Sequence, residues 1–131
     1  MKFTISTKAD IDGKSWTGVQ ITGLKAGEDL EACTPCTIKA DAAGMRRVFA
    51  AKAGDVFHGI TSPRKAYAGE AITVLGDGYR FHADDAAGLS AGDLFGLTAV
   101  AREADTASTT PVFRAVSKRD LQVIVSAVKT A

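Results

Sequence analysis

The chain has 131 residues, of which 46% are hydrophobic and 24% are charged, the balance of a single globular domain. Sixteen Lys and Arg residues are matched by fifteen Asp and Glu residues, and both signs are scattered along the chain. No basic stripe of the kind typical of nucleic-acid binders is visible, so we expect no nucleic-acid partner. No apolar run approaches the roughly 20 residues of a membrane helix, and the N-terminus lacks the pattern of a signal peptide, so we expect neither a membrane partner nor export.

The N-terminal segment combines strand-like ends with a polar loop, and we treat residues 1–24 as an arm that precedes a β-barrel-like domain at 25–131. We hypothesise that residues 1–18 add a strand to a neighbouring subunit by β-augmentation. Deleting residues 1–18 should then abolish binding to that subunit and leave the core folded. Trp16, the only tryptophan, fits an interface anchor and a core residue equally well.

A short pattern, Ala-Gly followed by an acid, recurs along the chain. Glycine adopts positive φ without steric cost, and the acid can accept hydrogen bonds from the local backbone, so each copy predicts a tight turn. An apolar, β-leaning segment follows every copy. The irregular spacing argues against a solenoid repeat. The four copies lie at residues 26–28, 53–55, 68–70 and 91–93.

Further turn signals fill the gaps between these copies. Residues 41–44 predict a turn, and Gly76 to Gly78 between two apolar runs predict a β-hairpin. Near the C-terminus, Leu121 and Val125 fit helical spacing, but the β-branched run at 123–125 favours a strand. We favour a short turn at residues 117–120 followed by a strand.

The spacing of the turns predicts the fold class. Turns at intervals of about 8–12 residues are typical of a small sandwich or barrel, and no alternation of strands with helices is visible. We therefore expect a mainly β protein: a compact antiparallel β-barrel as a single domain, with short turns and little helix.

Cys33 and Cys36 form the most conspicuous chemical motif, a CxxC pair. A zinc site needs two more ligands, and His58 and His82 each stand alone in strand-like sequence. A redox pair normally opens a helix, whereas Pro35 and the residues after it favour extended chain. We interpret the cysteines as small buried residues, with a local disulfide left open. No catalytic, metal-binding or cofactor-binding residue is predicted, so we expect a protein that is not an enzyme.

Two basic pairs, at residues 46–47 and 64–65, are candidate contacts for an acidic partner; the alternative is that they are solvated charges that discourage strand pairing at a sheet edge. Together with the N-terminal segment they make up the candidate interface, which consists of Met1, Lys2, Phe3, Thr4, Ile5, Trp16, Arg46, Arg47, Arg64 and Lys65.

Most of the chain after residue 24 resembles the head decoration (cement) proteins of tailed bacteriophages, of the small β-barrel-like kind called β-tulip. The resemblance lies in turn and strand patterns at residues 26–36, 53–55 with 59–60, 89–93 with 96–97, and 111–116 with 120–123. It implies synthesis in the bacterial host cytoplasm and a place on the outer capsid surface of the virion. It also implies binding to the major capsid protein, self-association as a homotrimer at local three-fold positions, and no catalytic residues.

Three other functions compete with this interpretation. Another structural virion protein, such as a tail-tube or spike component, would share the same sequence features. A glycan-binding module would need clustered exposed aromatic side chains, and aromatic residues make up only 7% of the chain. A small redox enzyme would have to use Cys33 and Cys36.

Overall fold

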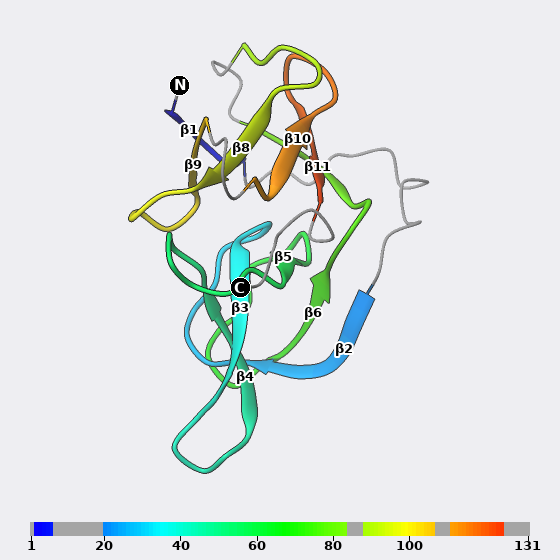
Figure 1. Ribbon diagram of the computed structural model, residues 1–131. Coiled ribbons are helices and arrows are strands. Elements are labelled where there is room, and N and C mark those ends of the chain that lie inside the picture. The colour runs from blue at the N-terminus through cyan, green and yellow to red at the C-terminus, as the bar shows by residue number, and fades with distance from the viewer. Residues whose placement is uncertain (1, 7–19, 84–87, 107–110, 125–131) are drawn as a thin grey trace.

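The computed structural model describes residues 2–6, 20–83, 88–106 and 111–124, and this part of the chain contains strands and turns but no helix. Its strands form two sheets, one above the other in Figure 1. The predicted mainly β, barrel-containing fold is therefore confirmed.

The lower sheet is a closed barrel in which each strand pairs with two neighbours. Only the pairing of β2 with β4 is parallel, and the other pairings are antiparallel. Closure satisfies the strand edges that an open sheet would expose. In the order in which they pair, the strands are β2 (Gln20–Ala26), β4 (Arg46–Ala50), β3 (Pro35–Ala40), β5 (Gly59–Thr61) and β6 (Ala71–Leu75).

The upper sheet is antiparallel throughout, and it contains both the first and the last strand of the described chain. It curls so far that an isolated bridge between Ile5 and Ala83 links its two edges. In the order in which they pair, its strands are β1 (Lys2–Thr4), β9 (Glu103–Thr106), β8 (Leu94–Leu97), β10 (Phe113–Ala115), β11 (Asp120–Val123) and β7 (Arg80–His82).

Two hydrophobic clusters hold this arrangement together. The larger one fills the curled sheet and reaches into the top of the barrel, where Phe57 meets the Phe113 ring edge-on at 5.4 Å between ring centroids. Phe81 packs against the same ring at 4.9 Å. The smaller cluster fills the barrel around Val48 and Val74. Because the larger cluster takes residues from both sheets, the sheets share one core.

The structure confirms three of the four predicted Ala-Gly-acid turns. Gly54, Gly69 and Gly92 adopt φ values of 96°, 87° and 93°, which only glycine reaches without strain. Gly27 has a different role, because a Cβ there would overlap the ring of Phe49. The absence of a side chain at this position leaves room for the Phe49 ring.

Two predictions about connections have opposite outcomes. The turn at residues 117–120 followed by a strand is confirmed, because the Ser117 hydroxyl accepts a hydrogen bond from the Asp120 amide at 3.3 Å and β11 follows. The hairpin predicted around residues 76–78 is wrong. Both strands form, but β6 belongs to the barrel and β7 to the upper sheet. The glycines therefore carry the chain from one sheet to the other.

The N-terminal segment requires a correction. Phe3 and Ile5 are only 6% and 1% exposed, and β1 pairs with β9 of the same chain. Removing residues 1–18 would thus remove two core side chains, contrary to our expectation that the core would stay folded. The expected boundary after residue 24 falls inside β2. Residues 7–18 lie outside the described part of the chain, so their role as an arm stays a prediction.

Candidate interaction surface on the barrel

A row of positively charged residues crosses the outside of the barrel. Lys39 of β3 pairs with Arg47 of β4, Arg47 pairs with Lys25 of β2, and Lys25 pairs with Ala71 of β6. Residues paired in register point to the same face of a sheet. The guanidinium of Arg64 extends this line by donating a hydrogen bond to the Ala71 carbonyl at 2.6 Å. We call Lys39, Arg47, Lys25 and Arg64 the basic row.

The next residues along the same strands show that the basic row faces solvent. Val48 and Ala26 are 0% and 1% exposed and belong to the barrel core. Because successive side chains on a strand alternate between faces, the residues before them point outward. Lys25, Lys39 and Arg64 are exposed accordingly, and Arg47 is half-buried.

One carboxylate balances part of this charge. Asp41, in the turn after β3, accepts a hydrogen bond from Nε of Arg47 at 3.1 Å. The backbone amide of Met45 and the Arg47 side chain hold the pKa of Asp41 below its usual value. Lys39 lies over the ring of Phe49, 5.1 Å from its centroid. Neither Lys25 nor Lys39 has a carboxylate partner among the residues that the structure describes.

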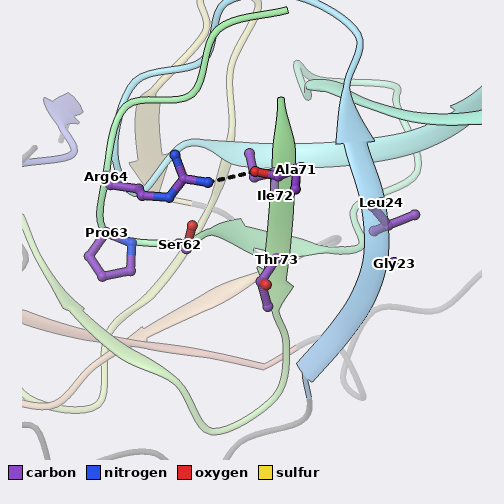
Figure 2. Close-up of a pocket in the computed structure, with 8 residues that line it drawn as sticks. All are labelled: Gly23, Leu24, Ser62, Pro63, Arg64, Ala71, Ile72 and Thr73. Carbon is purple, nitrogen blue, oxygen red and sulfur yellow. Dashed lines mark hydrogen bonds between the residues drawn. The ribbon is translucent and has the colours of Figure 1, made fainter. Parts of the chain in front are cut away.

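A shallow groove of about 390 Å³ adjoins the Arg64 end of the basic row. Figure 2 shows β6 running between β2 and the segment that carries Arg64. On the β2 side, Gly23 adopts a φ of 76° in a β-bulge, where the register with β6 shifts by one residue. The lining is mostly apolar, and it consists of Gly23, Leu24, Ser62, Pro63, Arg64, Ala71, Ile72 and Thr73.

The two predicted basic pairs lie in different surroundings. Arg47 and Arg64 belong to the basic row, whereas Arg46 is exposed near the tip of the β3–β4 hairpin, beside Met45, which is 58% exposed. The β3–β4 hairpin projects from the lower end of the barrel in Figure 1. Lys65 is not part of the basic row and forms an ion pair with Glu31 at 3.3 Å.

The N-terminal candidates divide by face. Lys2 and Thr4 are exposed on β1, whereas Phe3 and Ile5 are buried in the core of their own chain and are unavailable to a partner in this structure. Met1 and Trp16 lie outside the described residues.

Both cysteines are fully buried and carry free thiols, as the structural interpretation of the CxxC pair requires. Burial raises the pKa of Cys33 to about 11, although the nearby Arg102 guanidinium acts in the opposite direction. Burial also raises the pKa of Cys36, whose thiol contacts the Gly59 carbonyl at 3.4 Å. A thiol that stays protonated at neutral pH is a poor nucleophile and a poor metal ligand.

Both histidines serve the backbone or a neighbouring carboxylate. Nδ1 of His58 accepts a hydrogen bond from the Ile38 amide at 3.1 Å. Nδ1 of His82 lies 2.9 Å from a carboxylate oxygen of Asp120, whose other oxygen receives a hydrogen bond from Arg80 at 3.2 Å. In residues 2–6, 20–83, 88–106 and 111–124, no three His, Cys, Asp or Glu side chains are grouped as a metal site would need. Within these ranges, no helix is long and apolar enough to cross a membrane.

Comparisons with protein-family models, with curated proteins and with solved structures found no match.

The sequence interpretation missed Lys25 and Lys39. Each is a single lysine within a short apolar stretch, and neither is adjacent in sequence to another member of the basic row. Only the strand register brings them beside Arg47. A basic residue within each of three short apolar stretches was the available signal, but using it requires knowing that these stretches form neighbouring strands.

Proposed function

We propose that this chain is a decoration (cement) protein of a tailed-bacteriophage head, which binds the outer surface of the major capsid protein lattice as a homotrimer. The observation that carries the proposal is the resemblance of residues 25–131 to that family. The segments that carry it supply strands of both sheets: residues 59–60 lie in β5, 96–97 in β8, 113–115 in β10 and 120–123 in β11. The resemblance therefore draws on strands of both sheets, and it leaves out β1 and most of β2.

The distribution of accessible features supports a bridging role. The basic row and the β3–β4 hairpin lie on the barrel, while the exposed side chains of β1 lie on the other sheet (Figure 1). A protein that clamps several coat subunits needs contact surfaces on more than one side. Simultaneous contacts raise the overall affinity without requiring any single strong site.

The role also has a thermodynamic rationale. A ligand that binds the assembled lattice better than free subunits stabilises the lattice by mass action. Two sheets that share one hydrophobic core form a single close-packed body, and close-packed interiors transmit strain.

The test is co-sedimentation of the purified chain with expanded phage heads that lack their decoration protein, followed by cryo-electron microscopy. We expect saturable binding, with ordered density at the local three-fold positions. If the chain binds no form of the head, the proposal is wrong. Ordered density on a tail tube or spike would instead identify another structural component of the virion.

A further inference from the structure

We infer that the basic row and the adjoining groove together bind an acidic segment of a partner protein that carries an apolar side chain for the groove. The identification of that partner as the major capsid protein rests on the proposed function. The chemistry of the surface does not depend on it.

The charge arrangement is the first argument. Lys39, Arg47 and Lys25 occupy adjacent strands in register, and like charges placed directly opposite each other destabilise a sheet. Asp41 is the carboxylate that pairs with this group among the described residues, and it contacts only Arg47. A carboxylate-rich segment lying across the three strands would relieve this repulsion, so the surface is complementary to negative charge.

The groove is the second argument. It begins at Ala71, where the row reaches β6, and Ala71 and Pro63 give it accessible apolar surface, whereas Leu24 and Ile72 are each only 3% exposed and form its floor. The guanidinium of Arg64 stands at its rim, held by hydrogen bonds to the carbonyls of Ala71 and Lys65 at 2.6 and 3.4 Å. An apolar side chain placed in the groove would have the Arg64 guanidinium as its charged neighbour at the rim. A segment with one apolar anchor and flanking acids therefore fits both features.

A protein segment fits better than a nucleic acid. From Lys39 to Ala71 the row crosses three strand spacings, about 14 Å at roughly 4.8 Å each, which is too short for an extended phosphate track. Single-stranded nucleic acids also need open aromatic faces on which bases stack. The nearby ring of Phe49 is covered by Lys39 on one side and packs over Gly27.

The experiment compares two double variants of the full chain with equal changes in charge. Lys25→Glu with Lys39→Glu reverses the exposed lysines of the basic row. Lys52→Glu with Lys118→Glu, the matched control, reverses two exposed lysines outside it. Circular dichroism and the urea midpoint establish that both variants are folded. The probes are expanded undecorated heads, a labelled peptide with glutamates on either side of one leucine, and a single-stranded oligothymidylate.

We expect the row variant to bind heads and peptide at least tenfold more weakly than the wild-type chain, with the control variant within about twofold of it. The affinity of the wild-type chain for the peptide should fall as salt is raised, because exposed charges are screened. Equal losses in both double variants would show an unspecific charge effect and overturn the inference. Tighter binding of the oligothymidylate than of the peptide, lost in the row variant, would assign the surface to nucleic acid instead.

The groove is tested separately by Thr73→Trp, since Thr73 lines it from a half-exposed position on β6. This variant should weaken binding of the leucine peptide but leave binding of an otherwise identical alanine peptide unchanged. Equal binding of the leucine peptide to Thr73→Trp and the wild-type chain would remove the groove from the site.

Failure of this inference is distinguishable from failure of the proposed function. If the wild-type chain and the row variant bind heads equally well, the decoration role stands and the basic row is not the contact. If the wild-type chain binds the acidic peptide through the row but binds no head, the surface is assigned correctly and the decoration role is wrong.

Discussion

Phe49 and Gly27 illustrate how one residue determines the space available to the side chain of another. The Phe49 ring occupies the space that a Cβ of Gly27 would need, while the amide of Gly27 donates to the Val48 carbonyl at 2.8 Å. The glycine thus lets the Phe49 ring lie beside the parallel pairing of β2 with β4.

Replacing Gly27 with Ala should lower the free energy of unfolding by about 1 kcal/mol, because the added Cβ forces the half-exposed Phe49 ring from its position. Urea denaturation measures the change. The double variant Gly27→Ala with Phe49→Ala should lose less stability than the sum of the single variants, since the two residues are in contact. Additive losses would contradict this steric account.

Cys33 predicts a pH dependence of stability. Its pKa is raised from 9.0 to about 11 in the folded protein, so the folded state holds the thiol proton more tightly than the unfolded state. The resulting stability is complete below about pH 9 and is lost as the pH rises toward 11. The loss is at most about 3 kcal/mol, at roughly 1.4 kcal/mol per pKa unit.

Urea denaturation at pH 8 to 11 measures this loss, with Cys33→Ala as the control. Cys36, whose pKa is also raised by burial, titrates in both proteins and cancels in the comparison. Burial raises the pKa of Tyr79 and the nearby Cys33 adds to that shift, so the comparison measures Cys33 together with its effect on Tyr79. A Cys33→Ala variant that loses as much stability as the wild-type chain over this range would show that Cys33 is not the cause.

At the scale of an element, β5 is too short to cover β3. Its ladder pairs Ile60 and Gly59 with Pro35 and Cys36, and the His58 amide continues it to the Cys36 carbonyl at 3.0 Å. Two residues further along β3, the His58 imidazole takes over as acceptor for the Ile38 amide. A side chain thus replaces the missing strand.

The variants His58→Asn and His58→Leu separate this hydrogen bond from side-chain packing. Asparagine places an acceptor oxygen near the position of Nδ1, whereas leucine leaves the Ile38 amide without its partner. We expect the leucine variant to be about 1–2 kcal/mol less stable than the asparagine variant. Chemical denaturation measures the difference, and amide exchange at Ile38 locates it. Equal stability and exchange would show that the imidazole is not needed as an acceptor.

At the scale of the whole molecule, Arg102 joins the two sheets. One of its guanidinium nitrogens donates to the carbonyl of Ile5, next to β1, at 2.7 Å and to that of Ala32, before β3, at 3.2 Å. Its backbone adopts a φ of 64°, unusual for a residue with a side chain. Burial lowers the pKa of Arg102.

Replacing Arg102 with Leu should lower stability by about 1–3 kcal/mol, because two partly buried carbonyls lose a donor. Hydrogen exchange should increase most at the amides of β1, with little change in β3. Arg102→Lys, which keeps the charge but not the planar fork, should give an intermediate result. Equal increases in exchange across both sheets would mean that Arg102 stabilises the fold as a whole and does not join its parts.

Turn chemistry made most strands predictable, but not their neighbours. Gly54, Gly69 and Gly92 mark turns because positive φ is a local property that the sequence records. Strand pairing is not local: the same glycine-rich signal at residues 76–78 fits a hairpin and a passage between sheets equally well. The basic row was hidden for this reason, since Lys25, Lys39 and Arg47 become neighbours only through the registers of three strands.

The order of strands in the upper sheet has a consequence for synthesis. All strands of the barrel come from residues 20–75, so the barrel has its complete set of strands early in translation. β1 leaves the ribosome before any of them, but its partner β9 begins only at Glu103. Until then Phe3 and Ile5 have no core to enter, and contacts so distant in sequence form slowly. When several chains are made close together on one messenger RNA, the unpaired β1 of one chain can therefore pair with β9 of another.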